Sequence, residues 1–276
     1  MFPNETSKMA LCISGTFRTA WECHKSHFKN IVNAFPGQVD IYLQSYISDE
    51  AYQVWWAKER KDSTWNMASD IIDLYKPKAV CFEEMEPLQR RLNQEYHVDL
   101  GIPYWMHNNY AQLQMQYLGI KTCYELASKQ DNYDAFFRCR YDSWYFEPVD
   151  FSENWQFKDE HIMISRGEVG SRSGKGGFFS SYDKYRTKMN PFYKINDQSW
   201  WAGAKPYAYL ASLVDYVKAY CDPETGKTEL SPEGLYWRHM ISGDSEYTPV
   251  IEESIWQRII RDEDIPHLTF FENDAE

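Results

Sequence analysis

The chain lacks the features that mark several common classes of protein. No apolar run approaches the length of about 18 residues that a membrane-spanning helix needs. The opening residues, MFPNETSKMALCISG, have neither the basic segment nor the apolar segment of a signal peptide. We therefore expect no membrane span, no export and a cytoplasmic location.

The chain also has few positive charges and none of the common zinc-ligand spacings. Lys and Arg number 29 against 41 Asp and Glu, and the resulting net charge of −12 repels phosphate backbones, so we expect no nucleic-acid partner. The six cysteines contain no C-x-x-C pair, and the seven histidines form no H-x-x-x-H or H-E-x-x-H pattern. These absences argue against a zinc site, and we interpret the cysteines as reduced thiols.

One hydrolase signature and one nucleotide-binding signature are missing as well. No G-x-S-x-G elbow exists, which leaves serine hydrolase chemistry without support. The stretch GSRSGKGG looks like a phosphate loop, but Gly174 arrives one residue early and Lys175 is followed by Gly176 instead of Ser or Thr. We interpret this stretch as a flexible loop that could act as a lid.

Aromatic residues, by contrast, are abundant, with 11 Trp and 21 Tyr in 276 residues. Such rings can fill a core, or they can stack on flat ligands such as sugars and bases. Composition alone favours packing in the core, where large apolar side chains are usually found.

The pattern of apolar residues predicts alternating strands and helices. A strand–helix alternation of this kind favours a mostly parallel sheet with helices on its faces, and therefore an α/β fold. No repeat or linker is evident, so we expect a single domain over 1–276 with C-terminal helical elaborations. We expect strands at 8–14, 37–46, 78–84 and 133–142, helices at 66–75, 104–129 and 207–220, and a further helix that Ser231 caps.

The first candidate site is the turn ISGTFR that follows the first strand. Ligands of open α/β sheets bind beyond the carboxyl ends of the strands, and this turn lies there. Gly15 allows close approach of the backbone, and Arg18 can bind a phosphate with its planar guanidinium group. An ordinary strand-to-helix turn with a solvated arginine remains the alternative.

The second candidate is FFRCRYD, within the expected strand 133–142. Side chains alternate along a strand, so Arg138, Arg140 and Asp142 should share one face. Buried charge is costly unless it is paired or used. The stretch forms either a structural ion pair or an anion site, in which Asp142 could hold a divalent cation that bridges two phosphates.

The third candidate is NDQSWWAG, in which Asp197 and Gln198 precede paired tryptophans. An acidic residue beside aromatic rings suits the binding of a sugar, and Trp200 and Trp201 would then contact substrate together with Gln198. The alternative is a loop whose two tryptophans pack on the core.

The chain resembles a group of viral and bacterial glycosyltransferases in the order of its motifs. These motifs are SGTFR, VDIYLQSY, YDAFFRCRYD, NDQSWWAG and SPEGLYWRHM. That family has a GT-A-like fold, which binds nucleotide-diphospho-sugars. The resemblance spans most of the chain. It implies a nucleotide-sugar-binding half over about 8–150 and an acceptor-side half over 151–276.

The resemblance also implies roles for individual residues. Asp142 would bind Mn²⁺ or Mg²⁺ and the diphosphate, although DSW supplies one aspartate where the family has D-x-D. Asp197 would be the base or contact the sugar, and Glu233 is a weaker candidate of the same kind. The donor would be bound by Ser14, Gly15, Thr16, Arg18, Arg138, Arg140 and Asp142.

The expected activity is the transfer of a sugar from a nucleotide-diphospho-sugar to a hydroxyl acceptor, in glycan or polysaccharide synthesis. Two alternatives stay open. A sugar nucleotidyltransferase of related fold usually has a basic, glycine-rich first loop, and SGTFRTAW is poor in both. A non-catalytic carbohydrate-binding protein would use the paired tryptophans and ignore nucleotides.

Overall fold

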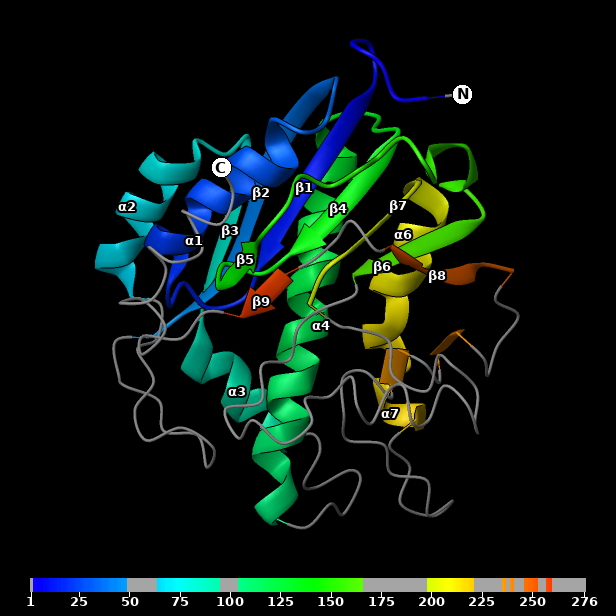
Figure 1. Ribbon diagram of the computed structural model, residues 1–276. Helices are drawn as coiled ribbons and strands as arrows, with labels where there is room; N and C mark the ends of the chain where they lie inside the picture. Colours follow the sequence, from blue (N-terminus) through cyan, green and yellow to red (C-terminus); the bar gives the residue numbers. More distant parts are fainter. Residues whose placement is uncertain are drawn as a thin grey trace, which may run out of the picture.

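The computed structural model describes residues 2–48, 64–94, 104–165, 198–220, 235–236, 239–240, 246–252 and 257–259. Within them a seven-stranded sheet has the order β3-β2-β1-β4-β7-β6-β8 (Figure 1). Its strands are β1 (Lys8–Ser14), β2 (Gln38–Ile47), β3 (Ala79–Glu84), β4 (Ala135–Cys139), β6 (His161–Ser165), β7 (Trp200–Ala202) and β8 (Thr248–Glu252).

Most pairings in this sheet are parallel, which confirms the predicted architecture. β7 alone among these strands is antiparallel to both of its neighbours, β4 and β6. A second, two-stranded sheet joins β5 (Ser143–Tyr145) to β9 (Gln257–Ile259). Figure 1 shows this small sheet near the ends of β1 and β4 toward which their arrows point.

Alternation along the buried strands produces two apolar cores, one on each face of the sheet. On β1, Ala10 and Cys12 belong to one core, while Leu11 and Ile13 belong to the other. Both faces are covered, so β1 is an unbroken apolar run and not an alternating one.

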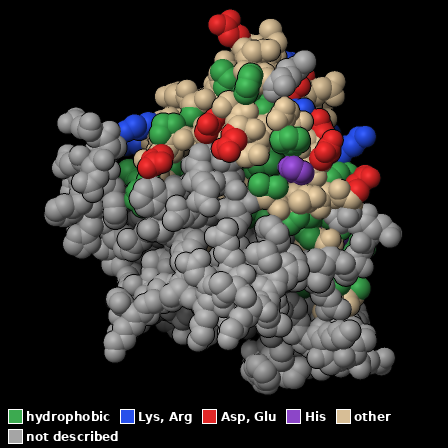
Figure 2. All heavy atoms as spheres, turned by 45° about the vertical axis from the view of Figure 1, so that its right-hand side comes forward, with side chains coloured by type: hydrophobic (Ala, Val, Ile, Leu, Met, Phe, Trp, Pro, Cys, Tyr) green, Lys and Arg blue, Asp and Glu red, His purple; other side chains and the backbone are tan. Residues whose placement is uncertain are grey.

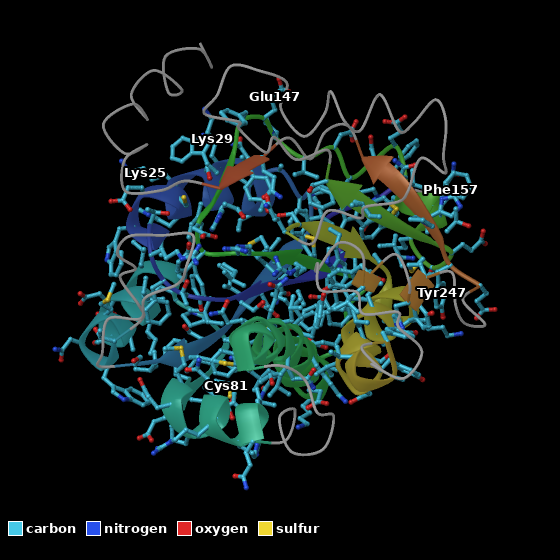
Figure 3. All side chains as sticks on the ribbon, turned by 90° about the horizontal axis from the view of Figure 1, so that it is seen from below. Lys25, Lys29, Cys81, Glu147, Phe157 and Tyr247 are labelled. Atoms are coloured by element: carbon cyan, nitrogen blue, oxygen red, sulfur yellow. The ribbon has the colours of Figure 1, made fainter. Side chains whose placement is uncertain are left out.

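Helices cover each face and complete the two cores (Figure 3). One face carries α1 (Ala20–His27), the π-helical turn η1 (Phe28–Val32) and α2 (Trp65–Tyr75). The other carries α3 (Met85–Gln94), α4 (Tyr104–Gln130), α6 (Ala204–Ala211), η4 (Ser212–Asp215) and α7 (Val217–Tyr220). A short 3-10 helix, η3 (Trp155–Phe157), contributes Trp155 to the same core as α1 and α2.

Several expectations need correction. The single helix expected at 207–220 is divided into α6, η4 and α7. The strand expected over 133–142 ends at Cys139, because a turn begins there and the Ser143 N–H donates to the Arg140 carbonyl. β7 was not anticipated, since three strand residues are too few to show periodicity. The GSRSGKGG loop and Ser231 lie outside the described residues, and the division into two halves stays a prediction.

Candidate anion-binding site

The site forms where the chain changes direction within the sheet. From β1 the chain passes to β2 on one side and returns later to β4 on the other side. β1 and β4 are parallel neighbours, with Ile13 opposite Cys139, so their following loops diverge from adjacent carboxyl ends. Such a switch point is where open α/β sheets usually bind ligands.

The loop after β1 has an unusual backbone. Gly15 has a φ of 130°, a value that glycine adopts far more easily than residues with a side chain. Arg18 has a φ of 36°, which is rare for a residue with a side chain. Phe17, fully buried, anchors the loop through edge-to-face contacts with Phe82 and Tyr141, at ring-centroid distances of 5.4 and 5.2 Å. The left-handed conformation of Arg18 costs about 1–2 kcal/mol, so a compensating contact is expected.

That contact is with Asp142, which lies just after β4. Arg18 Nη1 donates to Asp142 Oδ2 at 2.6 Å. Arg140 donates from Nε to Oδ1 at 2.8 Å and from Nη2 to Oδ2 at 2.9 Å. Asp142 is 1% exposed, against 12% for Arg18 and 21% for Arg140. Two partly exposed guanidinium groups therefore bind both oxygens of one buried carboxylate.

Arg138 occupies a different position from the other two arginines. It lies on β4 in register with Cys12 and Trp200, and its side chain is 1% exposed. Its Nη1 donates to the backbone carbonyl of Gln198, and its Nε has no hydrogen-bond partner among the described residues. A carbonyl accepts a hydrogen bond but does not neutralise the charge.

Three arginines thus follow or end the neighbouring strands β1 and β4. Arg18 and Arg140 share the carboxylate of Asp142, while Arg138 lies on β4 and bonds the Gln198 carbonyl. The described surface drawn in Figure 2 shows acidic and hydrophobic side chains and no broad basic patch. The three guanidinium groups near the carboxyl ends of β1 and β4 are the donors that would attract a compact anion there.

A hydrogen-bonded network that includes Gln257 supports this edge and was missed by sequence reasoning. Gln257 is fully buried, accepts from Ser199 Oγ at 2.8 Å, and donates to Ser165 Oγ at 3.2 Å. Its amide is also 3.5 Å from Gln198 Oε1. Tyr145 bonds Ser199 through its hydroxyl. No local signal could reveal Gln257, because the pairing of β9 with β5 brings it here.

A buried histidine links α1 to the segment that follows Asp142. His27 is fully buried, with Nε2 2.6 Å from the Ser143 carbonyl and Nδ1 2.9 Å from the Tyr75 hydroxyl. A carbonyl can only accept, so Nε2 carries the proton and Nδ1 accepts from Tyr75. Burial lowers the pKa of His27 to about 4, and the bond to Ser143 opposes this shift only in part.

Other residues predicted for the site lie nearby or in the core. Ser14 is buried at the end of β1, and Gly15 and Thr16 follow it in the loop. Trp200 and Trp201 are fully buried on opposite faces of β7, where Trp201 stacks on Trp155. Burial explains both rings as core residues, so we leave them out of the proposed site. Asp197 and Glu233 lie outside the described residues.

The donor set does not fit a divalent cation. Both oxygens of Asp142 accept hydrogen bonds from guanidinium groups. A metal ion bound to the same oxygens would lie close to these positive charges and be repelled by them. Within the described ranges, no three His, Cys, Asp or Glu side chains group closely enough to hold a metal. The Mn²⁺ or Mg²⁺ expected at Asp142 therefore finds no supporting ligands in this part of the chain.

In comparisons with known proteins, the chain shows a distant likeness to solved structures. No family model and no curated protein matches the chain. Among solved structures, the apo form of mouse xyloside xylosyltransferase 1 is similar with a TM-score of 0.39 and 8% identity, over 90% of this chain and 85% of that one. A likeness this distant identifies no activity. None of the described helices combines the length and apolarity needed to cross a membrane.

Proposed function

We propose that the protein is a glycosyltransferase that moves a sugar from a nucleotide-diphospho-sugar to a hydroxyl acceptor. The observation that supports this most is the pair of Arg18 and Arg140 on Asp142, with Arg138 on the adjoining strand β4, at the switch point of a mostly parallel sheet. Guanidinium groups bind phosphate oxygens with matching planar geometry. The fold class and the order of the sequence motifs agree with the glycosyltransferase resemblance.

The chemistry asks two things of the site. The departing nucleoside diphosphate carries developing negative charge, which preorganised cationic donors stabilise. Arg18 and Arg140, held by Asp142, and the buried Arg138 supply such donors. The loop backbone at Gly15 and Thr16, next to Ser14, would lie against the donor.

The second requirement is a base for the acceptor hydroxyl. A carboxylate within hydrogen-bond reach of that hydroxyl would take its proton as the new glycosidic bond forms. We propose Asp197, which directly precedes Gln198 in the sequence, with Glu233 as the weaker candidate. Gln198 is the described residue beside it, and its carbonyl accepts from Arg138.

The test is an assay of purified protein with UDP-, GDP- and TDP-sugars, read as release of the nucleoside diphosphate and as thermal shift. At least one donor should raise the melting temperature and be hydrolysed or transferred. Asp197→Asn should lower turnover at least 100-fold and leave donor binding intact. No shift and no turnover with any donor would overturn the proposal, and glycan binding without nucleotide binding would favour the carbohydrate-binding alternative.

A further inference from the structure

The carboxylate that should hold a metal is already bound by cations. Arg140 contacts Asp142 through two nitrogens, and Arg18 contacts it through one. We propose that the diphosphate of the donor is neutralised by Arg18, Arg138 and Arg140 in place of a divalent cation, so that nucleotide binding needs no metal. This inference rests on the proposed function and gives Asp142 a positioning role.

The charge of these guanidinium groups favours an anion over a cation. The diphosphate of a nucleotide-diphospho-sugar carries two negative charges, and guanidinium groups bind phosphate oxygens through charge-assisted hydrogen bonds. A divalent cation placed among the same guanidinium groups would instead be repelled by their positive charge.

Asp142 gives this cluster its geometry. A guanidinium is planar with five N–H donors, and the bidentate contact uses two of those on Arg140. The buried carboxylate therefore fixes the plane of Arg140, while the backbone conformation of Arg18 directs its side chain to the same oxygen. Side chains fixed before binding lose less conformational entropy when a phosphate arrives.

Arg138 supports the inference independently. Its side chain is 1% exposed, and its Nε is unpaired among the described residues. An arginine cannot relieve such burial by losing its proton, because a guanidinium group stays protonated in proteins. A buried charge is costly where no opposite charge lies beside it, and the Gln198 carbonyl supplies none, so an anion next to Arg138 would remove that cost.

The experiment is isothermal titration of the full chain with UDP, GDP and inorganic diphosphate, each in EDTA and in Mg²⁺ or Mn²⁺. The Kd of the best nucleotide should agree within about twofold between EDTA and metal. Binding that requires the metal would overturn the inference and leave the proposed transferase standing. Absence of nucleotide binding in both conditions would instead remove the proposed function, and the inference with it.

Two variants separate a specific site from general charge. Arg140→Gln removes the most exposed of the three arginines and should weaken nucleotide and diphosphate binding at least tenfold in EDTA. Arg90→Gln removes one charge from an exposed position on α3 and should change Kd less than twofold. Equal effects of the two variants would overturn the inference, and circular dichroism establishes that each variant is folded.

Discussion

Protonation of His27 should destabilise the fold by an amount that its surroundings define. The neutral ring donates to the Ser143 carbonyl and accepts from Tyr75, so a second proton on Nδ1 would face the Tyr75 hydroxyl oxygen while the ring is fully buried. Burial lowers the pKa of His27 from 6.5 to about 4. The unfolded chain therefore binds a proton more readily than the folded protein between these two values.

The difference between the two pKa values sets the direction and the size of the pH effect on stability. The contribution of His27 to stability is complete above pH 6.5 and is lost as the pH falls toward 4. At 1.36 kcal/mol per pKa unit the complete loss is about 3 kcal/mol, of which about 2 kcal/mol is lost between pH 8 and pH 5.

The assay is urea unfolding of the wild type and of His27→Gln at several pH values from 8 to 4.5. Gln can donate to the Ser143 carbonyl but does not titrate, so all other pH-dependent groups cancel in the comparison. The free-energy difference between the two proteins should shrink or reverse by about 2 kcal/mol between pH 8 and pH 5. A difference that stays constant over this range would refute the assigned burial and hydrogen bonding of His27.

Two further substitutions test the assignment of buried residues. Asp142→Asn should lower the free energy of unfolding by about 3 kcal/mol, because it leaves two guanidinium groups without their shared carboxylate. The control Asp159→Asn, at a 63% exposed side chain, should change that free energy by less than about 0.5 kcal/mol. Similar urea midpoints for the two variants would contradict this. Trp201→Ala should cost about 3–5 kcal/mol in the same measurement, since the indole is fully buried and stacked on Trp155, and a loss below about 1 kcal/mol would argue for a surface role.

The local pattern of the sequence is sufficient for much of the scaffold. The apolar run 8–14, the strand 37–46 and the helix 66–75 appear in the structure within about one residue, as β1, β2 and α2. Each has a strong periodicity or a continuous apolar stretch, and such local signals survive folding. The position of Arg18 beyond the carboxyl end of the first strand, and of Asp142 at the carboxyl end of a later strand, could likewise be expected from the alternation of elements.

Only the tertiary structure decided which charges meet. Strand alternation predicted that Arg138, Arg140 and Asp142 share one face, but β4 ends at Cys139 and the last two belong to a turn. Asp142 is bound by Arg18 from 124 residues away, and that contact depends on the pairing of β1 with β4. Gln257 likewise reaches the site only because β9 pairs with β5.

The two tryptophans show the same division. Their residue type and their place after Asp197 were visible in the sequence, and both a sugar platform and a core role agreed with them. Burial on opposite faces of β7 decides for the core, because a three-residue strand between β4 and β6 is covered on both sides. The sequence by itself determined the elements and the charges they carry, and long-range strand pairing decided which of these charges neutralise one another.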